Sequence, residues 1–164
     1  MPLFNNPKKE TWIILAFILL FIVALTVSSR ANSAEMEISY GKTIVRGQAD
    51  VLALTAVFPR QQGATDLFAG MMLVGSYDYS NYRTMPNQVF LRAGMTPHVG
   101  KWGFTLGVVA KQHNDVINSG MINFNLGIDY HVWSGLRLAY NHISNAGTSE
   151  PNIGRDMILA SWRF

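Results

Sequence analysis

Short segments in which hydrophobic and polar residues alternate run from residue 35 to the C-terminus, separated by turn-forming residues. A period of two is typical of β-strands, because consecutive strand residues point to opposite faces of a sheet. The alternation is clearest within residues 119–132, where the apolar set is Ile122, Phe124, Leu126, Ile128, Tyr130 and Val132. The residues between them are polar or small, so one face of this strand is apolar and the other is not.

The pattern predicts eight strands, at residues 36–43, 47–58, 67–79, 87–96, 101–112, 119–132, 135–145 and 154–164. Turn signals fill the intervals at residues 46–47, 59–65, 80–86, 97–100, 113–118, 134–135 and 146–153. Residues 51–58 and 67–74 are apolar on both faces. Their registers therefore stay open.

These segments favour an all-β fold, an eight-stranded antiparallel transmembrane β-barrel over residues 35–164. Most of the predicted strands are long enough for the roughly 9–11 residues of a tilted bilayer span. The polar face, with Arg92, Asp129 and Arg137, would fill the lumen, and the apolar face would meet lipid. Phe164 closes the last strand and follows Trp162, a terminal aromatic pattern that resembles the signal of outer-membrane barrels. A barrel of eight strands has its interior filled by side chains, which argues against a channel.

Connection lengths predict how this barrel is oriented. If both termini are periplasmic, the turns at residues 59–65, 97–100 and 134–135 are periplasmic, and the longer stretch at 146–153 faces outside. Short inner turns and longer outer loops are usual in such barrels.

Residues 1–34 have the layout of a signal peptide. Lys8 and Lys9 precede the apolar run 12–27, and small residues follow it, with cleavage acceptable after Ser33 or Ala34. The alternative is a retained membrane anchor. This segment holds three of the 13 basic residues and one of the 10 acidic residues, so ten basic and nine acidic residues remain. No basic patch is left to suggest nucleic acid.

Composition also limits the chemistry. The chain has no cysteine, which excludes disulfides, cysteine-based zinc sites and cysteine nucleophiles. His98, His113 and His131 show no spacing with one another or with carboxylates that indicates a metal ligand set, so no metal and no cofactor are expected. Lys111, Arg83 and Arg155 lie near predicted outer strand ends, where they could contact lipid phosphates.

Candidate chemistry gathers on the last two predicted strands. His142 and Ser144 share the outward parity of their strand, and Asp156 shares the outward parity of the next. Because these strands form a hairpin, a nucleophile, a base and an acid would converge on one outward patch near the outer leaflet. From spacing alone, an alternative is a hydrogen-bonded His142–Asp156 pair among headgroups at the rim.

The run His-x-Ser-Asn-Ala-Gly at 142–147, with Pro-Asn-x-Gly at 151–154 and an acidic residue fourteen positions after the histidine, resembles the active-site signature of the lipid A 3-O-deacylase (PagL-type) family. The resemblance implies that Ser144 is the nucleophile, that His142 is its base, and that Asp156 occupies the position of the family's glutamate. It also implies an oxyanion hole built from Asn152 with main-chain amides near Ala146 and Gly147. Glu150 is an alternative acid.

What the resemblance implies is a serine esterase of the outer membrane that removes the ester-linked 3-position hydroxyacyl chain of lipid A, with lipopolysaccharide as substrate and no metal. Two alternatives stay open: a catalytically inactive structural barrel, and a barrel esterase that acts on phospholipid. The oligomeric state, monomer or homodimer, is also open.

Overall fold

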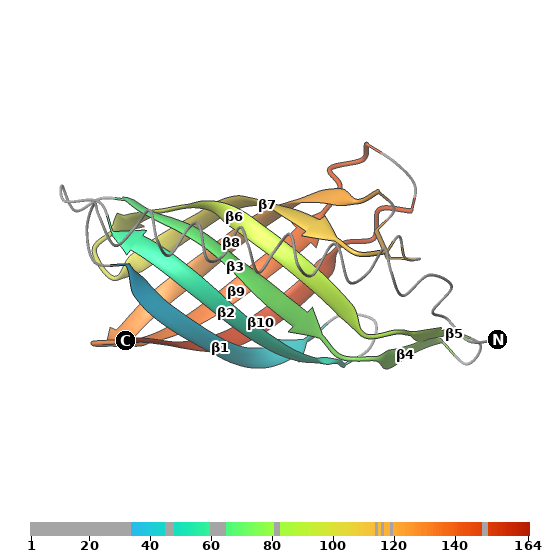
Figure 1. Ribbon diagram of the computed structural model, residues 1–164, viewed down its shortest axis with the longest axis horizontal. Coiled ribbons are helices and arrows are strands. Elements are labelled where there is room, and N and C mark those ends of the chain that lie inside the picture. Colours follow the sequence, from blue (N-terminus) through green and yellow to red (C-terminus); the bar gives the residue numbers. More distant parts are fainter. Residues whose placement is uncertain are drawn as a thin grey trace.

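The computed structural model describes residues 34–44, 48–59, 65–80, 83–113, 115, 117–118, 120–148 and 151–164. Eight strands close into an antiparallel barrel in the order β1-β10-β9-β8-β7-β6-β3-β2, and β1 pairs with both β10 and β2 (Figure 1). Their bounds are β1 Glu35–Thr43, β2 Asp50–Pro59, β3 Thr65–Val74, β6 Gln88–Val99, β7 Trp102–Lys111, β8 Ile122–Trp133, β9 Leu136–Ser144 and β10 Arg155–Arg163. The predicted eight-stranded barrel is confirmed.

Apolar side chains cover the outside of this barrel. Large hydrophobic residues that alternate along each strand are about half exposed, among them Leu106, Leu126 and Leu138. Their neighbours in sequence point inward, as the two-residue period requires. A closed ladder leaves no unpaired strand edge, and an apolar exterior around a partly polar interior is the arrangement of a transmembrane β-barrel.

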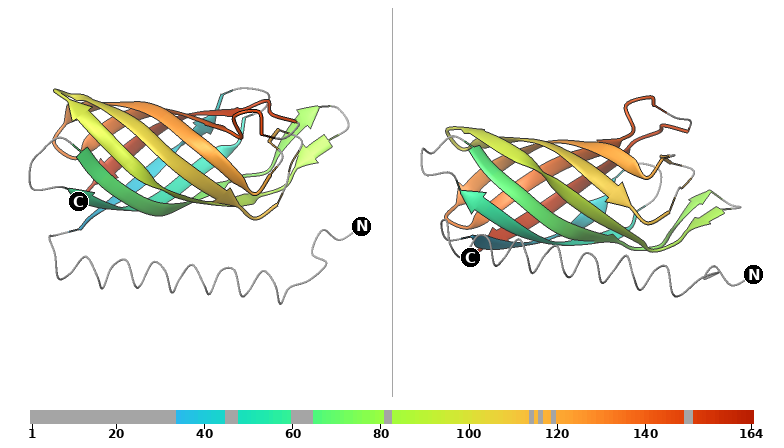
Figure 2. Two further views of the ribbon diagram at one scale, coloured as in Figure 1. Left: turned by 90° about the horizontal axis from the view of Figure 1, so that it is seen from above. Right: turned by 45° about the horizontal axis from the view of Figure 1, so that its top comes forward.

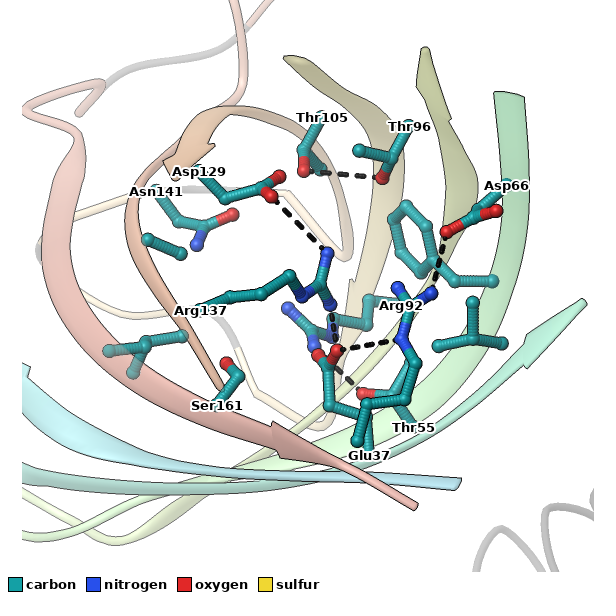
Figure 3. Close-up of a pocket in the computed structure, with 15 residues that line it drawn as sticks. Glu37, Thr55, Asp66, Arg92, Thr96, Thr105, Asp129, Arg137, Asn141 and Ser161 are labelled. Atoms are coloured by element: carbon teal, nitrogen blue, oxygen red, sulfur yellow. Dashed lines mark hydrogen bonds and ion pairs between the residues drawn. The ribbon is translucent and has the colours of Figure 1, made fainter. Parts of the chain in front are cut away.

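One network of buried charges occupies the half of the lumen nearest the C-terminus. Arg137 reaches from β9 to Glu37 of β1 and lies 3.3 Å from Asp129 of β8, as the labelled side chains of Figure 3 show. Arg163 of β10 contacts Asp66 of β3 at 2.9 Å. The pairs of Arg137 with Glu37 and of Arg163 with Asp66 connect strands that are not neighbours in the sheet. These ion pairs also compensate charges whose burial would otherwise be unfavourable.

The half of the lumen farther from the C-terminus contains an apolar cluster, which the sequence pattern did not predict, beside the buried charges of Lys111 and Arg155. Val51, Phe90, Ile143 and Met157 are almost fully buried there and pack in one cluster.

A cavity of about 30 Å³ lies within the charged network, lined by Glu37, Asp129 and Arg137 among others. It has room for roughly two or three water molecules and is too small for a lipid acyl chain.

The sequence pattern left open which residues of the early strands point inward, and the burial of the side chains of β2 answers this for that strand. Val51 and Ala53 point inward, whereas Leu52 and Leu54 point outward and are exposed. The structure thus assigns the small residues of β2 to the lumen and the large ones to the exterior.

Several strand boundaries differ from the predictions by up to five residues, and two of the differences have a clear structural reason. The strand predicted at 67–79 ends at Val74, because β2 begins at Asp50 and gives the chain no partner beyond that point. The chain then forms a separate hairpin of β4 (Tyr77–Ser80) and β5 (Arg83–Met85). The turn predicted at 97–100 is shorter, since β6 continues through Pro97 to Val99. Pro97 is tolerated because it lies opposite Thr65, the first residue of β3, where the ladder ends.

The barrel has two unlike ends. We call the end at Phe164 the C-terminal rim, and the end carrying the connections β3–β6, β7–β8 and β9–β10 the loop rim. Both views of Figure 2 show the β4–β5 hairpin and the β9–β10 connection at the loop rim, away from the C-terminus. The short turns at 100–101 and 134–135 lie at the C-terminal rim, beside the last strand. Connections at the two rims thus differ in length as predicted.

The expected signal peptide lies almost entirely at residues 1–33, outside the described residues. Among the residues that are described, no helix is both long enough and apolar enough to cross a membrane.

We expect Arg137→Met to destabilise the barrel strongly, by about 3–5 kcal/mol, because the substitution leaves the buried carboxylates of Glu37 and Asp129 without one of their guanidinium partners. Urea unfolding of the refolded barrel in detergent measures the change. Lys42→Met is the matched control, since the Lys42–Asp50 pair is more than half exposed and should contribute less than about 1 kcal/mol. Equal losses in the two variants would contradict a structural role for the buried network.

Candidate active site

The candidate site lies where β9 ends and β10 begins, at the loop rim. Asp156 lies directly opposite His142 in the antiparallel pairing of these strands, and Ile158 lies opposite Tyr140. Ile158 and Tyr140 are exposed on the barrel exterior, and the inward positions between them, Asn141 and Met157, are buried. The predicted outward parity of His142 and Asp156 is therefore confirmed.

A hydrogen bond joins His142 and Asp156 across the two strands. His142 Nδ1 lies 2.8 Å from Asp156 Oδ1, so the imidazole nitrogen donates to the carboxylate. The Tyr140 hydroxyl donates to the same oxygen. With Nδ1 occupied in this way, Nε2 is the nitrogen that remains for proton transfer, which is the arrangement that a serine hydrolase requires of its histidine.

Ser144 lies two residues after His142 on β9, and therefore on the same outward face. Successive residues of one face are separated by about 6.5–7 Å along a strand, and no hydrogen bond joins Ser144 to His142 among the described residues. Ser144 pairs with Phe124 of β8, and His142 pairs with Leu126. Both partners are exposed hydrophobic side chains, so the hydroxyl and the imidazole lie beside an apolar surface.

Gly154 makes room for the imidazole. A Cβ atom at this position would lie 3.1 Å from His142 Nε2 and would overlap Cε1, and the backbone φ is +81°. Both conditions exclude an ordinary side chain. The chain that leads into β10 thus passes against the histidine ring, and only glycine allows that contact.

The loop after Ser144 is organised by Asn145, which is fully buried. Its Oδ1 accepts the Gly147 N–H at 3.0 Å, and its carbonyl oxygen accepts the Thr148 N–H at 3.1 Å. Ala146 and Gly147 both have positive φ, 53° and 78°, as in a type I′ turn. The Gly147 amide, which the family resemblance assigns to an oxyanion hole, is therefore engaged with a side chain here.

Asn152 and Asn118 form hydrogen bonds that hold this loop in place. Asn152 Oδ1 accepts the Asn145 N–H at 3.0 Å. Asn118, in the β7–β8 connection, donates from Nδ2 to the Ile143 carbonyl at 2.9 Å and accepts the Gly154 N–H at 3.0 Å. One buried amide side chain therefore links the end of β9 to the start of β10.

Asp115 anchors the connection that carries Asn118. Its Oδ1 accepts the backbone N–H of Asn118 at 2.7 Å, and its Oδ2 lies 3.4 Å from Arg155 and 3.3 Å from Lys111. Burial works against ionisation of Asp115, but the Asn118 N–H, the Arg155 and Lys111 cations and the Gln88 amide together lower its pKa. Lys111 and Arg155 are buried in this cluster, so the expectation that they contact lipid phosphates is wrong.

Sequence reasoning missed Tyr140, Asn118 and the turn-building role of Asn145. Tyr140 carried a usable signal, because it has the outward parity of His142 one step earlier on the strand. Asn118 had no such sequence signal, since it lies in the β7–β8 connection, far in sequence from the last two strands. Glu150, the alternative acid, lies outside the described residues.

Comparison with known proteins gives one informative result. The fold is similar to that in the crystal structure of the outer membrane enzyme PagL, with a TM-score of 0.56 and 15% sequence identity, covering 79% of this chain and 98% of that chain. The shared feature is the fold. No protein-family model matches the sequence, and no curated protein matches it.

We expect Gly154→Ala to displace the His142 ring and to destabilise the barrel by more than the roughly 1–2 kcal/mol that a positive φ alone costs an alanine. Gly100→Ala is the matched control, because Gly100 has φ +61° and open space around it. Unfolding midpoints of the two variants, with histidine NMR shifts as a local readout, make the comparison. Equal destabilisation without a change in the His142 resonance would contradict the packing argument.

Proposed function

We propose that this protein is an outer-membrane serine esterase that removes the ester-linked hydroxyacyl chain at the 3-position of lipid A. Three observations support the proposal: an apolar barrel exterior, a fold similar to that of an outer membrane enzyme, and the residue pattern at 142–156 that resembles lipid A 3-O-deacylases. The observation that carries it is the outward His142–Asp156 hydrogen bond, two residues from Ser144.

The position of the site favours a lipid substrate. The polar pair lies on the outward face of the barrel, where the neighbouring strand positions Tyr140 and Ile158 are exposed, so a lipid substrate would reach it from the surrounding membrane. Phe124 and Leu126 lie exposed beside Ser144 and His142. An acyl chain in the outer leaflet would contact these apolar side chains while its ester reaches the hydroxyl.

In the proposed reaction, the Ser144 hydroxyl oxygen attacks the carbonyl carbon of the ester while His142 Nε2 takes the hydroxyl proton. Asp156 stabilises the imidazolium through Nδ1. Collapse of the tetrahedral intermediate breaks the bond to the sugar oxygen, which receives the proton from His142. Water, activated by the same imidazole, then hydrolyses acyl-Ser144 and releases a 3-hydroxy fatty acid.

The oxyanion requires donors that point to the new charge, and one such donor contributes about 3–4 kcal/mol. We assign the Asn152 side-chain amide and the Ala146 main-chain amide to this role. The Asn152 oxygen accepts from Asn145, which leaves its NH₂ group as the donor. Gly147 joins them when its N–H exchanges the Asn145 oxygen for the substrate oxyanion.

Mass spectrometry of lipid A from cells that express the protein tests the proposal. Wild type should produce lipid A that lacks one hydroxyacyl chain, Ser144→Ala should produce none, and Ser134→Ala, an exposed serine of the opposite rim, should match wild type. Intact lipid A together with hydrolysed phospholipid would reject the substrate. Intact lipid A and intact phospholipid, with the barrel folded, would reject the esterase.

We expect Asp156→Ala to lower kcat by about 10⁴-fold, because His142 loses the carboxylate that sets its tautomer and stabilises its cation. Glu150→Ala should change kcat little. Asp50→Ala, which removes a largely exposed carboxylate elsewhere, controls for the loss of one negative charge. A larger defect in Glu150→Ala than in Asp156→Ala would transfer the acid role to Glu150.

A further inference from the structure

A second cluster of chemically reactive groups lies at the C-terminal rim, at the end of the barrel opposite the candidate esterase site. His98 of β6 meets Asp129 and His131 of β8, and potential ligand atoms of the three residues all lie within 4.8 Å of one another. The two imidazole rings are edge to face, with centroids 5.3 Å apart. Strand β7 separates β6 from β8, so the cluster connects strands that share no backbone hydrogen bonds.

One spacing within this cluster is close to that of a tetrahedral metal site, and the others, at most 4.8 Å, would shorten when an ion binds. Ligand atoms about 2.0–2.1 Å from zinc lie roughly 3.3 Å from one another. His131 Nε2 lies 3.5 Å from Asp129 Oδ1. Asp66 of β3 lies 3.1 Å from His98 Nε2, and a carboxylate beside a ligating imidazole is a common feature of zinc sites.

Two local features keep these ligand atoms available. The Nε2 atom of His131 is buried and makes no hydrogen bond among the described residues. Gly103 lies opposite Asp129, and a Cβ atom there would overlap Asp129 Oδ2. Glycine at this position therefore accommodates the Asp129 carboxylate where it meets the histidines.

Buried ion pairs surround this cluster. Those within the described part of the chain connect the carboxylates of Glu37, Asp66 and Asp129 to the guanidiniums of Arg137 and Arg163. Arg92, which lines the same cavity and donates to Thr55, is a third buried cation. These charges balance one another, so the geometry of the ligand atoms carries the case for a metal ion.

We propose that His98, His131 and Asp129 form a zinc-type metal site, with Asp66 beside His98, that ties β6 to β8 at the C-terminal rim. Two imidazoles and a carboxylate are a ligand set that suits Zn²⁺ and its first-row neighbours. Arg137 and Arg163 also contact Asp129 and Asp66, at 3.3 Å and 2.9 Å, so each carboxylate of the site is fixed by an ion pair as well. The site is independent of the esterase reaction, and its consequence is stability of the barrel.

Zinc titration of the refolded, chelator-treated barrel in detergent tests this site. We expect one Zn²⁺ per chain, a higher unfolding midpoint in the presence of Zn²⁺ because the ion binds only the folded state, and a tetrahedral Co²⁺ spectrum when cobalt replaces zinc. His98→Gln and His131→Gln should each weaken Zn²⁺ binding by at least about tenfold, since each removes a ligand.

His113→Gln is the matched control, because His113 is exposed in the β7–β8 connection and should leave Zn²⁺ binding unchanged. Circular dichroism confirms that each variant keeps its β-structure, and a second variant, Asp129→Asn, tests the cluster if a histidine variant does not fold. No stoichiometric binding by wild type would overturn the proposal. Unchanged binding in the His98→Gln/His131→Gln double variant would overturn it as well.

Discussion

Asp156 lies opposite His142 because β10 pairs with β9 in one register and no other, and this pairing determines what the loop rim can do. A shift of one residue would turn Asp156 into the lumen and place Arg155 outside, since side chains alternate between the faces. Burial of Arg155 against Asp115 and of Ile143 and Met157 in the apolar cluster makes such a shift unfavourable. The lumen therefore holds the exterior groups in place.

The same register explains why polar chemistry is tolerated on an apolar exterior. A charged carboxylate facing hydrocarbon destabilises a membrane barrel, and the penalty falls toward the interface. Asp156 is next to the first residue of β10, near the rim, and both His142 and Tyr140 donate to it. The location of Asp156 near the rim lowers the free-energy cost of a carboxylate that faces lipid, and its two hydrogen bonds compensate the remaining cost.

Tertiary contacts from separate connections complete the site. The β7–β8 connection delivers Asn118 to both strands of the β9–β10 hairpin, and Asp115 holds that connection to Arg155. At the other rim, His98 and His131 come together across β7. In both cases the pairing of neighbouring strands brings together residues that are at least 25 positions apart in the sequence.

The alternation of residues by itself determined the strand count, the antiparallel barrel and the outward parity of His142 and Asp156, because a period of two converts directly into the face that a side chain occupies. It did not determine the end of β3 at Val74, the apolar cluster in the lumen or the meeting of His98 with His131. Those features depend on which strands lie side by side and how far they are staggered, and the strand pairings of the folded barrel decide both. The local sequence pattern determines which face of the sheet a side chain occupies. Only the tertiary structure determines which residues of different strands lie close together.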